Sequence, residues 1–263
     1  MAAESLRDLL EVAVDLAEEA GKITLQYFGN YPAVETKADM TPVTVADREV
    51  EAYLRAAIAS RFPGDGIIGE EFGEERAGAA RRWIIDPIDG TFSFIHGVPL
   101  YGLLIGVEQD DEPLLGVIRL PALDETVAAA CGEGCRWQGR KTTVSTVSEL
   151  SAALCLATDL GGQDPTQSSA LRRLAAATGA TRTWGDCYGY VLVATGRADV
   201  MVDPVMHVWD CAALLPVIEE AGGVFTDWQG RRTIRRGNAV ASNGLLHDQV
   251  LALLSNSRET RER

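Results

Sequence analysis

Two carboxylates, a proline and a hydroxyl lie within six residues of one another in the segment Asp86-Pro87-Ile88-Asp89-Gly90-Thr91. Pro87 fixes its own φ and keeps Asp86 out of the helical region, so Asp86 and the Ile88 carbonyl can face one point. Hard cations prefer such oxygen ligands. Asp89-Gly90-Thr91 resembles a helix start with Asp89 as its cap. The free backbone N–H groups of Gly90 and Thr91 would then hold an anion. The segment predicts adjacent cation and phosphate sites, although Asp-Pro and Asp-Gly are also ordinary turn dipeptides.

Further carboxylates are expected at the ends of secondary-structure elements. Glu70 follows a short apolar strand at 67–69, whereas Asp47 and Asp210 fall in the first turns of two predicted helices. Thr44 and Asp47 fit a capping box, and Asp210 would complement the dipole of its helix. From these residues alone, the capping box explains Asp47 better than catalysis does, and the helix dipole is the simpler explanation of Asp210.

Apolar periodicity predicts the elements that carry these residues. The first half should combine two helices with a largely antiparallel sheet, and the second half should alternate strands and helices, so the fold class is α/β. We expect an α+β lobe at 1–148 and an α/β lobe at 149–263 that form one continuous unit. The predicted helices cover 5–28, 45–61, 168–177, a stretch from 186, 208–221 and 245–254, and the predicted strands cover 67–69, 83–85, 103–107, 114–120, 126–130, 134–137, 154–157, 181–184, 198–202, 224–226 and 239–241.

Composition excludes several classes of function. A net charge of −14 gives nucleic acid and anionic membranes no electrostatic reason to approach. The five cysteines include no C-x-x-C pair, which predicts reduced structural thiols. No nucleotide-binding glycine motif and no G-x-S-x-G occurs, and the three histidines are expected to be structural. The run from Val98 to Val107 is too short to cross a bilayer, and no signal pattern opens the chain, so we expect a soluble, cytoplasmic protein.

Taken together, these motifs resemble the inositol monophosphatase family of magnesium-dependent, lithium-sensitive phosphatases. The resemblance covers nearly the whole chain and rests on Asp47, on Gly69-Glu70-Glu71, on the segment 86–91, and on Trp209-Asp210-Cys211-Ala212-Ala213 followed by Glu220-Ala221-Gly222-Gly223. It implies a layered αβαβα sandwich of the inositol monophosphatase and fructose-1,6-bisphosphatase type. It also implies a homodimer that acts on a small phosphate ester.

The resemblance further implies roles for individual residues. Glu70, Asp86 and the Ile88 carbonyl would hold one Mg²⁺, and Asp86, Asp89 and Asp210 a second, while Glu70 would help to hold a third; Mn²⁺ is a possible substitute. Thr91, paired with Asp47, would orient and deprotonate the attacking water, and the N–H groups of Gly90 and Thr91 would bind phosphate. Lys37 would contribute a positive electrostatic field near the site, or it would be an ordinary surface residue.

The segment Trp184-Gly185-Asp186-Cys187-Tyr188-Gly189-Tyr190 departs from the inositol-specific pattern and resembles the histidinol-phosphatase branch of the family. Asp186 and Asp203 would pair with a cationic substrate such as histidinol phosphate, an intermediate of histidine biosynthesis, while Trp184 or Tyr188 offers an aromatic face and Arg182 a contact. The simpler explanation is that Asp186 caps the following helix and Arg182 anchors a strand end by an ion pair. The alternatives are an inositol-1-phosphate or broad sugar-phosphate phosphatase, and a silent cation-binding homologue.

Overall fold

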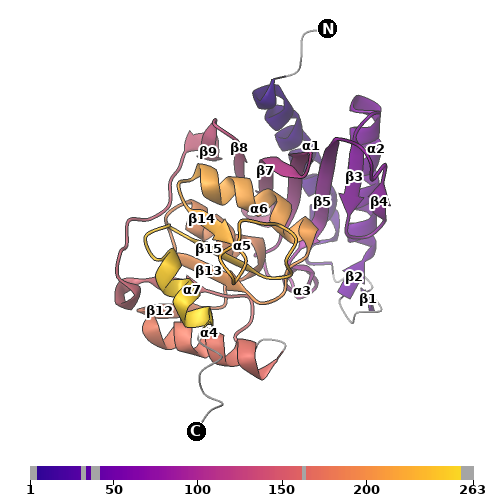
Figure 1. The fold of residues 1–263 in the computed structure, drawn as a ribbon. Helices are drawn as coiled ribbons and strands as arrows, with labels where there is room; N and C mark the ends of the chain where they lie inside the picture. Colours follow the sequence, from indigo (N-terminus) through magenta and orange to yellow (C-terminus); the bar gives the residue numbers. More distant parts are fainter. Residues whose placement is uncertain (1–4, 31–33, 37–41, 162–163, 256–263) are drawn as a thin grey trace.

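Helices and sheets alternate in five layers. The computed structural model describes residues 5–30, 34–36, 42–161 and 164–255. Helices α1 and α2 cover one face of an eight-stranded sheet, α5 and α6 lie between that sheet and a five-stranded sheet, and α4 and α7 cover the outer face of the second sheet (Figure 1). This arrangement confirms the predicted αβαβα sandwich. Lys37 lies outside the described residues.

The first helical layer forms because its apolar residues repeat at helical spacing behind strong N-terminal caps. Helix α1 (Leu6–Tyr27) begins after Ser5, and α2 (Val45–Arg61) begins after Thr44; both have a capping box, completed by Asp8 and Asp47 respectively. Their buried faces pack on the eight-stranded sheet in one apolar cluster. The capping box predicted for Thr44 and Asp47 is thus confirmed.

The eight-stranded sheet has the order β10-β9-β8-β7-β6-β5-β3-β4, and all its pairs are antiparallel except β3 with β5. Strand β5 is longer than predicted, because the chain stays extended through Asp86 and Asp89, with an irregularity between them. The strands are β3 (Gly66–Gly69), β4 (Gly73–Glu75), β5 (Arg81–Asp89), β6 (Gly102–Gln109), β7 (Glu112–Leu120), β8 (Glu125–Ala130), β9 (Gly134–Trp137) and β10 (Arg140–Lys141); β1 (Val34–Thr36) pairs separately with β2 (Pro42–Thr44).

The second half supplies the remaining layers. Its sheet has the order β12-β11-β13-β15-β14. The strands are β11 (Leu154–Leu156), β12 (Ala180–Arg182), β13 (Val200–Asp203), β14 (Val224–Thr226) and β15 (Ala239–Ser242). The helices are α4 (Pro165–Ala177), α5 (Asp186–Ala194), α6 (Val208–Glu220) and α7 (His247–Ser255), with a short α3 (Thr91–Ile95) in the first half and 3₁₀ turns at Pro121–Leu123 and Leu150–Ala152. Helices α4 and α7 and strand β12 are each shifted by up to three residues from their predicted bounds.

Two glycines let α6 approach the first sheet closely. Gly106 and Gly116 are opposite one another on β6 and β7. A Cβ at Gly116 would lie 2.1 Å from the Ala213 carbonyl oxygen, and one at Gly106 would lie 2.6 Å from the Ala212 Cβ. Glycine is therefore needed at both positions because the helix backbone occupies the space of a side chain. This contact sets how close α6 lies to the sheet.

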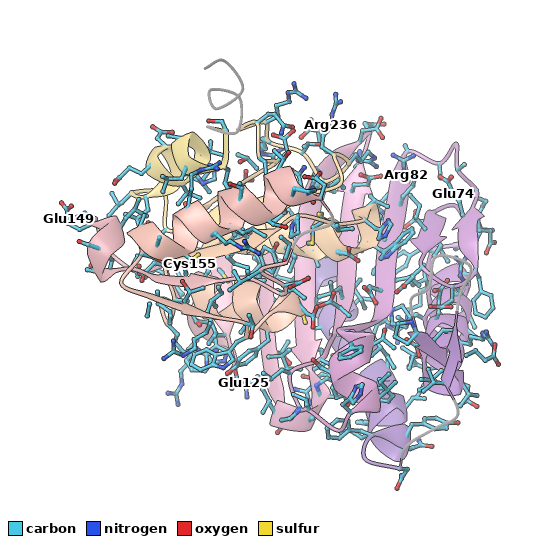
Figure 2. All side chains as sticks on the ribbon, turned by 90° about the horizontal axis from the view of Figure 1, so that it is seen from below. Glu74, Arg82, Glu125, Glu149, Cys155 and Arg236 are labelled. Carbon is cyan, nitrogen blue, oxygen red and sulfur yellow. The ribbon has the colours of Figure 1, made fainter. Side chains whose placement is uncertain are left out.

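The five cysteines are all free thiols, as predicted, and four are buried. In Figure 2 the labelled Glu74, Glu149 and Arg236 lie toward the outline of the molecule, whereas Cys155 lies within it. Within the described part of the chain, no helix combines the length and the apolar character that a bilayer span needs. The division into lobes at 148 and 149 stays a prediction.

Candidate active site

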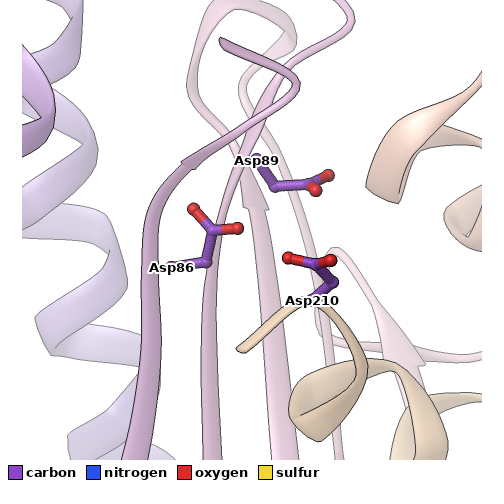
Figure 3. A group of neighbouring side chains, drawn as sticks. All are labelled: Asp86, Asp89 and Asp210. Atoms are coloured by element: carbon purple, nitrogen blue, oxygen red, sulfur yellow. The ribbon is translucent and has the colours of Figure 1, made fainter. Parts of the chain in front are cut away.

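Three carboxylates from distant parts of the chain meet at one point. Asp86 and Asp89 come from the last residues of β5, and Asp210 comes from the first turn of α6. One oxygen from each lies within 4.8 Å of one oxygen from each of the others. Figure 3 shows the three side chains near one another, with Asp86 and Asp89 on one segment of the chain and Asp210 facing them from another. The structure therefore brings together the three residues that the sequence assigned to one cation.

Burial and mutual repulsion disfavour negative charge in this cluster. Burial, together with the neighbouring carboxylates of Glu70, Asp89 and Asp210, raises the pKa of Asp86 well above its ordinary value. Burial, and then repulsion between Asp89 and other carboxylates including Asp210, raises the pKa of Asp89 to about 7, and burial is also the largest cause of a pKa of about 7 at Asp210. A divalent cation would offset two of these three negative charges, so the donor set fits a hard metal ion.

Backbone N–H groups hold each of these carboxylates in place. Asp86 Oδ1 accepts from the Ile88 N–H at 3.0 Å, and Asp210 Oδ2 accepts from the His207 N–H at 2.7 Å. Asp89 Oδ2 accepts from the Cys187 N–H at 2.5 Å. The bond to His207 is a capping contact that was not predicted, since only a dipole role was expected for Asp210, so capping and cluster membership coexist in one side chain.

The prediction that Asp89 caps a helix is wrong. The N-cap of α3 is Gly90, in the left-handed region at φ 79°, and it makes no side-chain cap bond. The Asp89 carboxylate instead binds the first turn of α5, which presents the Cys187 N–H. That donor lies in another layer of the fold and could not be inferred from residues near Asp89.

An open hollow of 310 Å³ lies over the cluster. Glu70, the Ile88 backbone and Thr91 border it together with the three aspartates. Glu70 is half-buried there, but its carboxylate is not within 4.8 Å of all three aspartates. The full lining is Pro42, Glu70, Asp86, Ile88, Asp89, Gly90, Thr91, Phe92, Asp186, His207, Trp209 and Asp210.

Asp47 and Thr91 do not form the direct hydrogen bond that was expected between them. The Thr91 hydroxyl donates to the Ile88 carbonyl at 2.9 Å, and Asp47 Oδ2 accepts from the Thr44 N–H and hydroxyl at 2.8 and 2.7 Å. Asp47 Oδ1 is buried and has no hydrogen-bond partner among the described residues. Burial, the largest cause, raises the pKa of Asp47, and the Glu70 charge raises it further. An acceptor oxygen thus stays available beside the cluster.

A second, more enclosed cavity of 230 Å³ adjoins the cluster on the side of the five-stranded sheet. Asp89, Asp186 and Asp210 line both this cavity and the open hollow, and Asp159 and Asp203 line this cavity alone. Its other lining residues are Thr158, Cys187, Tyr190, Pro204, Val205, Met206 and Leu214. This cavity combines several carboxylates with an apolar wall, which suits a cationic group carried on an organic skeleton.

Asp186 faces both cavities and is not a helix cap. The N-cap of α5 is Gly185, and Asp186 follows it in the left-handed region at φ 51°. Its N–H donates to the Thr158 hydroxyl at 2.8 Å, and its carboxylate lies against Gly90, where an added Cβ would be 2.8 Å from Asp186 Oδ2. Burial, then the charges of Asp89 and Asp203, raises its pKa well above the ordinary value. A non-glycine residue held in this backbone region is typical of a functional site.

Of the other residues predicted to contact the substrate, some line the cavities and others do not. Asp203 is buried, and its oxygens accept from the Thr158 N–H and from the Tyr190 hydroxyl, both at 3.0 Å. Arg182 is exposed, borders neither cavity, and donates to the carbonyl of Thr181 at 2.7 Å; the ion pair expected at this strand end is not found among the described residues. Tyr190, and not Trp184 or Tyr188, is the aromatic residue of the enclosed cavity.

Sequence reasoning missed three residues that shape the site: Glu51, Thr158 and Asp159. Thr158 and Asp159 follow β11, so their place at a strand's carboxyl end was an available signal. Glu51 lies four residues after Asp47 on the same helix, on its buried face. A glutamate is rarely buried without a partner, so its place on the buried face was a signal that Glu51 binds a polar group elsewhere in the fold.

Comparison with known proteins agrees with this geometry. A model of the inositol monophosphatase family matches residues 5–259. The chain is 47% identical over 255 residues to a histidinol-phosphatase of Chlorobaculum parvum, covering 96% of this chain and 98% of that one. It is 41% identical over 255 residues to a histidinol-phosphatase of Mycobacterium tuberculosis, covering 94% and 98%. The solved structure of a Thermotoga maritima IMPase has a TM-score of 0.86 and 31% identity over 95% of this chain and 98% of that one. With its layered fold and acidic cluster, the chain belongs to the inositol monophosphatase family.

Proposed function

We propose that the protein hydrolyses histidinol phosphate to histidinol and inorganic phosphate. The observation that carries this proposal is the enclosed acidic cavity beside the carboxylate cluster, because histidinol phosphate bears an ammonium group and a protonatable imidazole. Two similar proteins are named histidinol-phosphatases, which supports the same substrate. The phosphate would face the cluster, and the cationic part would enter the enclosed cavity.

The cluster is proposed to hold two or three Mg²⁺ ions, with Mn²⁺ as a substitute. Asp86, Asp89 and Asp210 would hold one ion, while Glu70, Asp86 and the Ile88 carbonyl would hold another. Bound Mg²⁺ neutralises the phosphate dianion, lowers the pKa of the attacking water and stabilises the leaving alkoxide. The chain's own part is to fix these oxygens in advance through its backbone N–H bonds.

Thr91 and Asp47 are proposed to orient the attacking water and accept its proton. Ala46, next to Asp47, packs with Ile88 and Phe94 in one buried cluster, so the start of α2 adjoins the Thr91 turn. Rotation of the Thr91 hydroxyl away from the Ile88 carbonyl would free it for the buried Asp47 Oδ1. The water would give a proton to Asp47 through the Thr91 hydroxyl, its oxygen would bond to phosphorus as the ester P–O bond breaks, and the leaving alkoxide would take up a proton from solvent.

Asp186 is the residue on which substrate choice is proposed to depend. We expect Asp186→Asn to lower kcat/KM for histidinol phosphate by about tenfold or more, because a charge-assisted hydrogen bond is lost. For inositol 1-phosphate, which carries no cation, the change should stay within about threefold. Asparagine is the matched substitution, since it tolerates positive φ and keeps the side-chain shape.

Steady-state kinetics on both esters checks this expectation. Equal losses for the two substrates would reduce Asp186 to a structural residue. A wild-type preference for inositol 1-phosphate would favour the inositol or broad sugar-phosphate alternative. Phosphate release that does not respond to Mg²⁺ would favour a silent cation-binding homologue.

The homodimer, the cytoplasmic location and lithium sensitivity remain proposals that follow from the family. An exposed apolar set beside the site supports self-association: Phe92 is 69% exposed, Trp184 43%, Val205 40% and Val98 39%. Light scattering on the purified protein would establish the oligomeric state.

A further inference from the structure

Glu51 is a buried carboxylate that the proposed reaction does not use. It lies on α2, one helical turn after Asp47, and its side chain is 0% exposed. Burying a charged group is costly unless hydrogen bonds and an opposite charge compensate. The partners of Glu51 therefore indicate what this position does.

Those partners belong to the turn that follows Glu70. The Glu71 N–H donates to Glu51 Oε2 at 2.7 Å, and the Phe72 N–H donates to Oε1 at 3.1 Å. Arg55, one turn further along α2, donates from Nε to Oε1 at 2.8 Å. The buried carboxylate thus binds two successive backbone amides between β3 and β4 and is itself paired with a cation.

Arg55 and Gly69 complete this clamp. The Arg55 side chain is 13% exposed, donates to the Gly73 carbonyl and lies 3.8 Å from Glu75 Oε2. A Cβ at Gly69 would lie 2.1 Å from Glu51 Oε1, so only glycine admits the carboxylate beneath this strand end. The residues that follow Glu70 in this turn, from Glu71 to Gly73, are thus hydrogen-bonded to α2.

We propose that Glu51 is a positioning residue that directs Glu70 into the metal site and so sets its affinity for Mg²⁺. The inference rests on the proposed role of Glu70 as a metal ligand. Glu70 borders the same open hollow as Asp86, Asp89 and Asp210, and the two residues that follow it donate their backbone N–H groups to Glu51. Its direction depends on the turn, and the turn depends on Glu51.

A double-mutant cycle on Mg²⁺ binding tests this role without substrate. Isothermal titration with MgCl₂ would compare the wild type, Glu51→Gln, Glu70→Gln and the double variant. Glutamine keeps the size of the side chain but replaces one acceptor oxygen with a donor. We expect Glu51→Gln to weaken Mg²⁺ binding by about 10- to 100-fold, and to cause no further loss in the Glu70→Gln background.

Glu220→Gln is the matched control. Glu220 also binds two backbone amides of a turn, those of Gly132 and Gly134 at 2.8 and 2.7 Å, but it lies at the opposite end of α6 from Asp210. We expect this variant to lose stability and keep wild-type Mg²⁺ affinity.

Wild-type Mg²⁺ affinity in Glu51→Gln, or losses that simply add in the double variant, would overturn the proposal. Unchanged affinity in Glu70→Gln would instead contradict the ligand set on which the proposal rests. Should Glu51→Gln fail to fold, Arg55→Lys offers a milder change that keeps the charge and removes the fork of donors. Faster amide hydrogen exchange at Glu71 and Phe72, with weaker Mg²⁺ binding, is expected there; unchanged exchange and affinity would overturn the proposal.

Discussion

At the scale of single residues, hydrogen bonds fix the three carboxylates of the cluster in positions where burial and mutual repulsion disfavour their negative charge. Each of Asp86, Asp89 and Asp210 accepts one backbone N–H, which leaves other lone pairs directed at a shared point. Two of these contacts are local and could be inferred from the sequence: Asp86 accepts from a residue two positions away, and Asp210 from one three positions away. The contact of Asp89 could not, because its donor is 98 residues away in the chain.

Thr91 provides a test of the water-orienting role. We expect Thr91→Ala to lower kcat by about 10²- to 10⁴-fold while Mg²⁺ affinity stays near the wild-type value, because the hydroxyl is proposed to act in proton transfer and not as a ligand. Thr91→Ser keeps the hydroxyl and should stay within about tenfold. Single-turnover kinetics together with calorimetry separates the two effects, and parallel loss of metal binding in Thr91→Ala would reassign Thr91 to the metal site.

At the scale of elements, the site depends on where α5 and α6 begin. Their N-termini approach the end of β5 because the helices are packed between two sheets. The existence of both helices was predictable from apolar spacing, and the start of α6 at Val208 agrees with the prediction. The close approach of α6 to the sheet was not predictable, because it depends on Gly106 and Gly116 facing one another across β6 and β7.

Gly116→Ala tests this packing. The new Cβ would meet the Ala213 carbonyl oxygen at 2.1 Å, so α6 must shift away from the sheet. We expect a loss of about 1–3 kcal/mol in the free energy of unfolding and weaker Mg²⁺ binding, since α6 carries Asp210. Gly64→Ala is the control, because nothing lies within 4 Å of its added Cβ. Denaturant unfolding would measure both variants, and equal stability of the two would contradict the packing argument.

At the scale of the whole molecule, the sequence predicted the layers but not their internal order. The two halves, one with an antiparallel sheet and one with alternating strands and helices, were predictable from periodicity and from the family resemblance. The strand order β12-β11-β13-β15-β14 was not, because pairing between distant strands leaves no local pattern. The start of α2 was predictable because the capping box of Thr44 and Asp47 lies within four residues of sequence.

The stability of the metal-free protein should depend on pH in a defined direction. In the folded state the pKa of Asp89 and the pKa of Asp210 are each raised from an ordinary 3.8 to about 7. Between those values the folded protein binds more protons than the unfolded chain, so the stability contributed by these groups is present at low pH and is lost as the pH rises. We expect the metal-free Tm to fall as the pH rises from about 4 to about 7.

Thermal unfolding with and without Mg²⁺ checks this pH dependence. Mg²⁺ should raise Tm more at the higher pH, because there it binds carboxylates that have lost their protons. In the Asp89→Asn, Asp210→Asn double variant, the fall of Tm with pH should be smaller. The same slope in this variant and in the wild type would show that the pH dependence arises elsewhere.

The most direct test is a crystal structure of the protein soaked in Mn²⁺, with anomalous diffraction recorded for the wild type and for Asp86→Asn. We expect an anomalous peak at roughly 2.1 Å from oxygens of Asp86, Asp89 and Asp210 in the wild type, and its loss in the variant. A wild-type map with no peak among these three carboxylates would contradict the assignment of the cluster as a divalent-metal site.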